Sequence, residues 1–263
     1  MDENTPDPDT PAPAAIAHLA GTRSVRAVWR NDLGGLTFEV GAGIERQFVK
    51  WSPHGSGLDL TREAARLRWA VEYTAVPAVV AVGADADGQW LVKTALPGEN
   101  AATPRWVADP ARAVAAIGRA LRALHDALPV AECPFDWSVQ RRLAALDEAG
   151  RHDPARWHPC HQHLDSRDAR ERLTHPPRID RLVVCHGDSC APNTLLTEDG
   201  ACSGPVDLGS LGGADRWADL AVATWSAEWT YGPGWADVLL EAYGTAPDEQ
   251  RSAYYRLLWD LSP

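Results

Sequence analysis

Short runs of β-branched and aromatic residues alternate with turn residues early in the chain and predict a β-rich segment. Three such runs, VRAVW, LTFEV and RQFVKW, lie within 25–51 and are separated by glycine-containing turns, so we expect three antiparallel strands. Apolar residues then recur at helical spacing over 60–73 and predict one helix. Two further strands are expected at 78–82 and 90–95, on either side of an Asp-Gly turn.

Pro97 and Gly98 close this segment, and beyond them the apolar spacing becomes mainly helical. The helices expected from this spacing cover 110–128, 136–149, 166–173, 214–228, 234–243 and 248–261. A strand at 182–185 and a hairpin formed by 194–197 and 202–206 interrupt them. The pattern predicts an α+β fold with a small antiparallel-sheet lobe at 15–96 and a larger, mostly helical lobe at 97–263.

The first fourteen residues are rich in Pro, Asp and Thr and bury too little apolar surface to offset the entropy of ordering, so 1–14 is predicted to be a disordered tail. The tail lacks the basic and apolar regions of a secretory signal, and no later run is long and apolar enough to span a membrane. The five cysteines show no paired spacing, which favours reduced thiols. A soluble, cytoplasmic protein is expected.

The chain of 263 residues carries a formal net charge of −11. This charge disfavours nucleic acid and anionic membranes as partners because both bind basic surfaces, whereas a polycationic small molecule would be attracted. Only two of the 25 Lys and Arg residues, Lys50 and Lys93, are lysines. G+C-rich codons produce such a bias, and the two remaining lysines therefore become more interesting as functional candidates.

The segment HGDSCAPN, residues 186–193, places an Asp five positions before an Asn, and Asp207 ends the hairpin that follows. Phosphoryl transfer from a nucleotide requires a carboxylate that receives or orients the proton of the acceptor hydroxyl. It also requires an amide and a second carboxylate that hold metal on the phosphates. Asp188, Asn193 and Asp207 supply these groups in the order that protein kinases use.

The first lobe supplies the cation that this chemistry requires. Lys50 ends the third predicted strand, where a kinase places the cation for the α- and β-phosphates, and Glu63 lies in the next helix, where its carboxylate can fix that cation. The turn at 31–35 is the candidate loop over the phosphates. The joint order of loop, Lys, Glu, HGD, Asn and Asp predicts a two-lobed, protein-kinase-like fold.

Several segments resemble the aminoglycoside 3′-phosphotransferases: VVCHGDSCAPN, VDLGSLGGADRWADLA, FVKW with TREAARLRW, and WLVKTALPG. The resemblance covers nearly everything after about Val25. It implies Asp188 as catalytic base, Asn193 and Asp207 as Mg²⁺ ligands, Lys50 with Glu63 as phosphate clamp, and the backbone of Thr94 and Leu96 as adenine contacts. It also implies transfer of the γ-phosphoryl group of ATP, with GTP as an alternative donor, to a sugar hydroxyl of a cationic aminoglycoside. Such an enzyme would be a monomer or weak dimer and would serve resistance or antibiotic biosynthesis.

The chain departs from the family pattern mainly where substrate is held. Relatives usually carry Arg after the DLG turn and acidic residues beside the Trp157 position, but here the residues are Ser210, Ala155 and His158. Leu33 stands where a polar loop residue often caps the triphosphate. The side chains that remain as candidates for drug binding are the acids Glu228, Asp260, Asp153 and Asp165 and the aromatic residues Trp157, Trp229 and Trp235.

These departures keep open a kinase for another hydroxylated metabolite, such as a macrolide, a homoserine-like compound or choline. A different class of function is a pseudokinase that binds nucleotide or a partner without turnover, which the complete motif set disfavours. The cluster of His and Cys residues at 158–163 suggests zinc, but four ligands within six residues do not easily close a tetrahedron, so a polar loop is predicted. His186 is expected to bond the backbone, and Asp215, Arg216 and Asp219 to brace the catalytic loop or cap a helix.

Overall fold

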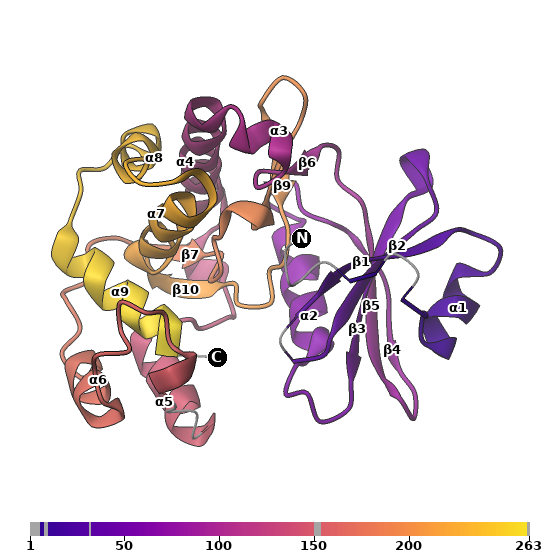
Figure 1. The fold of residues 1–263 in the computed structure, drawn as a ribbon, viewed down its shortest axis with the longest axis horizontal. Helices are drawn as coiled ribbons and strands as arrows, with labels where there is room; N and C mark the ends of the chain where they lie inside the picture. Colours follow the sequence, from indigo (N-terminus) through magenta and orange to yellow (C-terminus); the bar gives the residue numbers. More distant parts are fainter. Residues whose placement is uncertain (1–5, 8–9, 32, 150–153, 262–263) are drawn as a thin grey trace. The chain divides into compact units, whose positions relative to one another are not determined.

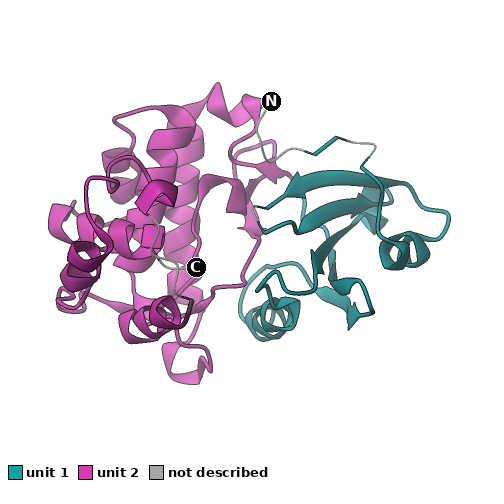
Figure 2. Ribbon diagram, turned by 60° about the horizontal axis from the view of Figure 1, so that its bottom comes forward, with its two compact units in different colours: residues 1–97 teal, residues 98–263 magenta. Residues whose placement is uncertain are grey.

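The computed structural model describes residues 6–7, 10–31, 33–149 and 154–261 (Figure 1). It divides the chain into two compact units, Met1–Pro97 and Gly98–Pro263 (Figure 2). The division falls between Pro97 and Gly98, the pair at which the apolar spacing changes. None of the described helices is long and apolar enough to cross a bilayer.

Unit 1 contains an antiparallel sheet with the strand order β1-β2-β3-β5-β4 (Figure 1). The strands are β1 (Val25–Arg30), β2 (Leu36–Val40), β3 (Gln47–Pro53), β4 (Val79–Ala84) and β5 (Gly88–Thr94), which confirms the five predicted strands. In the β3–β5 pair, Val49 lies opposite Val92 and Lys50 lies opposite Leu91. Because side chains alternate between the two faces of a strand, Lys50 and Lys93 project from the face opposite to that of Val49 and Val92.

The Val49 face of the sheet packs against α1 (Ala14–Ala20), whose Ile16 is fully buried in the same hydrophobic cluster as Phe38. Ala12, which belongs to the predicted tail, also packs against this cluster. The expectation of a single helix in this lobe is therefore wrong, because α1 is a second one. A helix of seven residues with two buried positions is too short for its periodicity to be recognised in the sequence.

The second helix of unit 1, α2 (Leu60–Ala70), packs against β4 and β5. Its N-cap is Asp59, whose carboxylate accepts hydrogen bonds from the backbone N–H groups of Thr61 and Arg62 at 3.0 and 3.3 Å. The helix ends at Ala70, three residues before the predicted end at 73. Glu63 lies within its buried stripe, so α2 holds a carboxylate in an otherwise largely apolar surface.

Unit 2 is mostly helical. Its α-helices are α3 (Pro104–Val107), α4 (Pro110–Ala127), α5 (Val139–Ala149), α6 (Ser166–Leu173), α7 (Trp217–Tyr231), α8 (Ala236–Tyr243) and α9 (Glu249–Leu261). Residues 217–227 of α7 are all buried, so α7 is the central helix of the unit and packs on α8 and α9. On α4, a Cβ at Gly118 would collide with the backbone of Leu239, and glycine therefore allows α4 and α8 to approach closely.

Two small sheets complete unit 2. β6 (Glu99–Asn100), β8 (Thr194–Leu196) and β9 (Cys202–Pro205) form one sheet, and β7 (Leu182–Cys185) pairs with β10 (Gly212–Asp215) in the other. The predicted 194–206 hairpin is confirmed. The helix predicted from 214 begins instead at Trp217, because Ala214 and Asp215 pair with Val183 and Leu182 as the end of β10.

Candidate active site

Asp188 lies in the loop of unit 2 that connects β7 to the 3-10 turn η4 (Ala191–Asn193). Nδ2 of Asn193 donates a hydrogen bond to Oδ2 of Asp188 at 3.1 Å and another to the Asp188 backbone oxygen at 2.8 Å. Sγ of Cys190 donates to the other carboxylate oxygen, Oδ1, at 3.3 Å. The carboxylate is therefore oriented by two side chains of its own loop.

Asn193 connects this loop to the segment that carries Asp207. Its backbone oxygen accepts a hydrogen bond from the Val206 N–H at 2.9 Å, which places the residue before Asp207 beside η4. Because the Asn193 NH₂ group donates to Asp188, its side chain presents Oδ1 as the atom that can ligate a cation. The structure thus brings Asp188, Asn193 and Asp207 to one place in unit 2.

The backbone at Asp207 is unusual. With a φ of 63°, it is the one residue other than glycine with positive φ in the part of the chain that the structure describes. Such a conformation costs free energy for a residue with a Cβ, although Asp tolerates it better than most. Gly187, with a φ of 88°, leaves no room for a Cβ because the Ser210 backbone occupies that space. The loop before Asp188 therefore packs directly on the turn after Asp207.

Asp219 of α7 holds the loop that carries Asp188. Its Oδ2 accepts from the His186 N–H at 2.6 Å, its Oδ1 accepts from the Gly187 N–H at 2.9 Å, and its backbone oxygen accepts from the Ser189 hydroxyl at 2.7 Å. Burial alone would raise the pKa of Asp219, but the hydrogen bond and charge of His125 and these N–H groups hold it below its usual value. The predicted bracing role of Asp219 is confirmed.

Two histidines complete the network around Asp219. Nε2 of His125 donates to Asp219 at 2.9 Å, and its Nδ1 lies 2.8 Å from the Tyr243 hydroxyl. His186 accepts the Asp188 N–H at Nδ1 and contacts the Val206 backbone oxygen through Nε2 at 2.9 Å. The backbone-bonding role predicted for His186 is therefore confirmed, and the loop is fixed at both ends.

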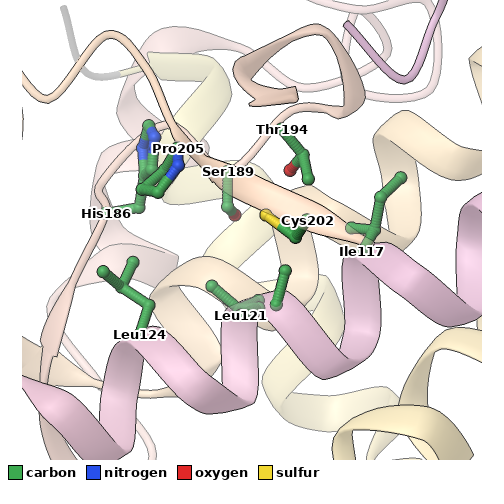
Figure 3. A pocket seen from close by; sticks show the side chains of 9 residues that line it. Ile117, Leu121, Leu124, His186, Ser189, Thr194, Cys202 and Pro205 are labelled. Atoms are coloured by element: carbon green, nitrogen blue, oxygen red, sulfur yellow. The ribbon is translucent and has the colours of Figure 1, made fainter. Parts of the chain in front are cut away.

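A small cavity lies beside the loop that carries Asp188, between α4 and the β8–β9 hairpin (Figure 3). Its volume is about 20 Å³, and it is lined by apolar residues of α4, including Leu121 and Leu124, and by His186, Ser189 and Cys202. A space of this size holds one water molecule and cannot hold a nucleotide or a sugar. Burial raises the pKa of the Cys202 thiol, which keeps it protonated at neutral pH.

In unit 1, Glu63 is the centre of the predicted phosphate clamp. Its Oε2 lies 2.8 Å from Nζ of Lys50, so the predicted pair is formed. Its Oε1 lies 2.6 Å from Nζ of Lys93, a contact that the sequence did not indicate. Both lysines of the chain therefore bind the same carboxylate.

The turn between β1 and β2 is held by Asn31. Oδ1 of Asn31 accepts from the N–H groups of Leu33 and Gly35 at 3.0 and 2.7 Å, and its backbone oxygen accepts from Gly34 at 3.1 Å. Asp32, within the candidate phosphate loop, lies outside the described residues. Since the Asn31 side chain already engages these donors, the loop could cover phosphates with these N–H groups only after rearrangement.

The proposed adenine contacts lie where β5 ends. The Thr94 N–H donates to the Ala78 backbone oxygen at 2.9 Å, so a contact between Thr94 and a base would use its carbonyl oxygen. The Leu96 carbonyl accepts from Arg46 at 3.4 Å, and its N–H is the group we expect to face the base. An adenine edge requires one acceptor and one donor, and Thr94 and Leu96 stay the predicted contacts.

Among the candidate drug-binding acids, the described ones already have partners. The carboxylate of Asp260 accepts from the His158 N–H at 3.0 Å and from Nδ1 of His161 at 2.6 Å, and its side chain is only 9% exposed. Glu228 lies 3.6 Å from Arg256, and Asp165 caps α6. Asp153 lies outside the described residues.

The candidate aromatic residues differ in exposure. Trp157 is 5% exposed and presents little surface to a sugar, whereas Trp229 is 44% exposed. His158 stacks on Trp229 with ring centroids 5.5 Å apart, and Trp225 lies 4.7 Å from Trp229. Ser226, next to Trp225, accepts the Ala191 N–H at 2.9 Å, so this aromatic cluster adjoins the 3-10 turn that follows Asp188.

The substitution Asp260→Ala is expected to raise KM for an aminoglycoside with a smaller change in kcat. It also removes the acceptor for His158 and His161 and should lower the free energy of unfolding by about 1–3 kcal/mol. Asp260→Asn keeps an acceptor oxygen for the His158 N–H and should lose less stability. Steady-state kinetics and thermal denaturation of both variants check this; wild-type KM and stability in Asp260→Ala would remove Asp260 from the site.

The His and Cys cluster at 158–163 does not gather metal ligands in the described part of the chain. Nδ1 of His158 lies 3.0 Å from Sγ of Cys160, while His161 turns to Asp260. The ligand atoms that do lie within 4.8 Å of one another belong to His125, Cys185 and Asp219. Nε2 of His125 already donates to Asp219 at 2.9 Å and Sγ of Cys185 donates to the Asp215 backbone oxygen at 3.3 Å, so a hydrogen-bonded scaffold describes this group.

Two parts of the site were not foreseen from the sequence. Lys93 binds Glu63 only because β5 pairs with β3, although the scarcity of lysine had marked it. His125 reaches Asp219 across a sequence separation of 94 residues, and the sequence contains no signal for that contact beyond a polar residue in an apolar helix stripe.

Comparison with known proteins supports the same chemistry. Residues 20–255 match the family described as "Phosphotransferase enzyme family". An aminoglycoside 3′-phosphotransferase of Streptomyces fradiae is 38% identical, over 88% of this chain and 92% of the relative. A streptomycin 3″-kinase of Streptomyces griseus is 34% identical, over 94% of this chain and 96% of the relative.

Solved structures extend the likeness to the fold. A crystal structure of an aminoglycoside 3′-phosphotransferase of type VIII has a TM-score of 0.78 at 32% identity, covering 94% of this chain and 96% of that one. An aminoglycoside phosphotransferase of Streptomyces rimosus, in complex with ADP and streptomycin, has a TM-score of 0.77 at 27% identity, covering 94% and 95%. With its fold, its motif residues and these relatives in agreement, the chain belongs to the phosphotransferase enzyme family.

Proposed function

We propose that this protein transfers the γ-phosphoryl group of ATP to the 3′-hydroxyl of an aminoglycoside, with Asp188 as the catalytic base. The observation that carries the proposal is the placement of Asp188, oriented by Asn193 through a 3.1 Å hydrogen bond, beside the segment that bears Asp207. Two relatives at 38 and 39% identity are aminoglycoside 3′-phosphotransferases of Streptomyces species, which supports the substrate class.

Asp188 would act on the acceptor hydroxyl. Its carboxylate is half-buried and held by Asn193 and Cys190, so it can accept or orient the hydroxyl proton without first reorganising. Burial, together with the nearby charge of Asp188, raises the pKa of the Cys190 thiol well above its usual value. Cys190 therefore remains a neutral donor and does not compete with the base.

Lys50 would bind the α- and β-phosphates, and Asn193 and Asp207 would hold Mg²⁺. The Oδ1 of Asn193 and the carboxylate of Asp207 are oxygen ligands of the kind Mg²⁺ prefers, so the residues present fit the metal. When bound, Mg²⁺ neutralises charge on the phosphates. The protein itself positions these ligands. The hydrogen bond to Asp188 fixes the side-chain amide of Asn193, and the backbone conformation of Asp207 sets the direction of its carboxylate.

The acidic balance of the protein suits a polycationic acceptor. A net charge of −11 raises the rate at which a cationic drug encounters the protein, and this contribution weakens as salt screens it. Glu228 and the exposed face of Trp229 are the substrate contacts we favour, with Asp260 acting through the loop it holds.

One of the relatives supports the 3″-hydroxyl as an alternative acceptor position. The streptomycin 3″-kinase relative is 34% identical over 96% of its own length, and this chain has Ala155 and His158 at positions where its resemblance to the aminoglycoside 3′-phosphotransferases leads us to expect acids. The loss of those acids would change which drug ring is held, but it would leave the transfer chemistry unaltered.

The test is an ATP-consumption assay of the purified protein against aminoglycosides with and without a 3′-hydroxyl, and against streptomycin, with a no-drug control for ATP hydrolysis. Activity on 3′-hydroxyl drugs and none on their 3′-deoxy analogues is expected. Turnover of streptomycin alone would favour the 3″-position. Failure with every aminoglycoside would overturn the proposal.

A further inference from the structure

Four aromatic residues of unit 2 contact one another and form what we call the aromatic platform: His158, Trp225, Trp229 and Trp259. The ring centroid of Trp229 lies 4.7 Å from that of Trp225 and 6.0 Å from that of Trp259, and His158 stacks on it at 5.5 Å with an interplanar angle of 26°. Trp225 is 4% exposed and anchors the platform in the core, whereas Trp229 is 44% exposed. The platform therefore leaves Trp229 open to a ligand.

The platform lies next to the turn that follows Asp188. The N–H of Ala191, the first residue of η4, donates to the hydroxyl of Ser226 on α7 at 2.9 Å. Trp229 follows Ser226 by three positions, so the two side chains are neighbours on the helix surface and about 4.5 Å apart along its axis. A ligand that places a hydroxyl at Asp188 and carries further rings can therefore reach the platform.

The two carboxylates beside the platform, Asp260 and Glu228, already have partners. Oδ2 of Asp260 lies 2.6 Å from Nδ1 of His161, and Glu228 lies 3.6 Å from Arg256. Arg256 is fixed in turn, because it donates to the Thr224 hydroxyl at 3.2 Å. An ammonium group of a ligand would have to compete with these partners, so charge pairing with the two acids would contribute little to its binding.

Aromatic rings bind a cationic sugar in a different way. The face of an indole ring attracts an ammonium group within about 6 Å of its centroid, and its flat surface covers apolar atoms of the ligand. Single exposed aromatic side chains need no explanation, but Trp229 belongs to a cluster of four rings near Asp188. One of these rings, His158, stands where the family resemblance leads us to expect an acid, and it stacks on Trp229.

We infer that the aromatic platform is the subsite for an ammonium-bearing sugar ring of the acceptor, and that Trp229 contacts this ring. The inference rests on the proposed function. Ring stacking and cation–π attraction hold the sugar here, in place of the carboxylate pairs expected from the family resemblance. Because Trp229 belongs to α7 and not to the loop that carries Asp188, it holds the sugar about equally in the ground state and the transition state.

Trp229→Leu and Trp229→Phe test the inference, since leucine keeps apolar surface without an aromatic ring and phenylalanine keeps a smaller ring. With kanamycin, or with streptomycin if the wild type accepts only that drug, Trp229→Leu should raise KM for the drug about tenfold. Trp229→Phe should raise it about threefold. Both kcat and KM for ATP should stay within about threefold of the wild type. Direct titration of the drug in the presence of ADP should give the same ratios of Kd.

Ile179→Ala is the control, because Ile179 is 64% exposed in unit 2 and does not belong to the platform. It removes exposed apolar surface and should leave KM and Kd for the drug unchanged. A purely structural role for Trp229 would lower the thermal midpoint of Trp229→Leu without raising either constant. That result, or a loss confined to kcat, would overturn the inference. If the wild type phosphorylates no aminoglycoside, the proposed function is wrong instead.

A measurement on the wild-type protein keeps the inference testable if Trp229→Leu does not fold. The chain has 12 Trp residues, and labelling with 5-fluorotryptophan gives each of them a ¹⁹F NMR signal. The signal that is missing from Trp229→Phe belongs to Trp229. Addition of the drug and ADP to the wild type should shift this signal. An unshifted Trp229 signal at a drug concentration that saturates turnover would overturn the inference.

Discussion

Asp188→Asn is expected to reduce kcat by roughly 10²-fold or more while the affinity for ATP changes little. Asparagine keeps the size of the side chain and an oxygen that can accept the hydrogen bond from Asn193, so the loop should keep its shape. It cannot receive a proton from the acceptor hydroxyl. The loss therefore falls on the transition state and leaves nucleotide binding in the ground state nearly unaffected.

The measurement is steady-state kinetics with an accepted aminoglycoside, combined with direct titration of ATP. Asp237→Asn is a suitable control, because Asp237 is an exposed aspartate in the first turn of α8 and loses the same charge without touching the catalytic loop. Its kcat should match that of the wild type. A kcat for Asp188→Asn within a few-fold of the wild-type value would remove Asp188 from the mechanism.

Much of the fold could be predicted because it follows from local patterns. Strands β1 to β5 and helix α4 have clear periods of two and 3.6 residues, and turns or prolines mark their ends. β10 could not be predicted, because its sequence, Gly-Gly-Ala-Asp, has low strand propensity. It is a strand because the buried residues of β7 pair with it.

The sequence motifs predict which side chains lie close together in the fold, but not which contacts hold those side chains in place. The order of Asp188, Asn193 and Asp207 along the chain was sufficient to predict that they meet in space. The second lysine on Glu63 depends on strand register, and the support of His186 by Asp219 joins residues 33 positions apart. Such contacts are set by tertiary packing, which periodicity and motif spacing do not encode.

The drug-binding side was the least predictable part for a related reason. A carboxylate near the C-terminus looks available in the sequence, yet Asp260 is engaged by the His158 N–H and by His161. Trp157 has an aromatic ring suited to stacking, yet it is 5% exposed. Exposure and existing partners decide whether a side chain can meet a ligand, and both are known only once the chain is folded.

Asp207 is the second residue for which a large effect is expected, and its backbone decides how the experiment must be designed. Asp207→Ala removes the one full negative charge that we assign to the Mg²⁺ site, so the Mg²⁺ concentration needed for half-maximal activity at fixed ATP should rise by about tenfold or more. The same change places alanine at a φ of 63°, which costs about 1 kcal/mol or more for a residue with no side-chain polar group. A loss of activity in this variant alone could therefore come from weaker Mg²⁺ binding or from backbone strain at position 207.

Asp207→Asn separates them. Asparagine tolerates the left-handed conformation about as well as aspartate and keeps one ligand oxygen, but it has no charge. If Asp207 serves the metal, Asp207→Asn should need clearly more Mg²⁺ than the wild type while its thermal midpoint stays close to the wild-type value. Asp207→Ala should show the larger Mg²⁺ requirement together with a lower thermal midpoint.

Direct titration of Mg²⁺ and ATP binding, with Asp237→Asn as the charge-matched control, distinguishes the two effects. If Asp207→Asn and Asp207→Ala both retain the wild-type Mg²⁺ dependence, the carboxylate does not ligate the metal, and the positive φ at Asp207 belongs only to the turn that packs against Gly187.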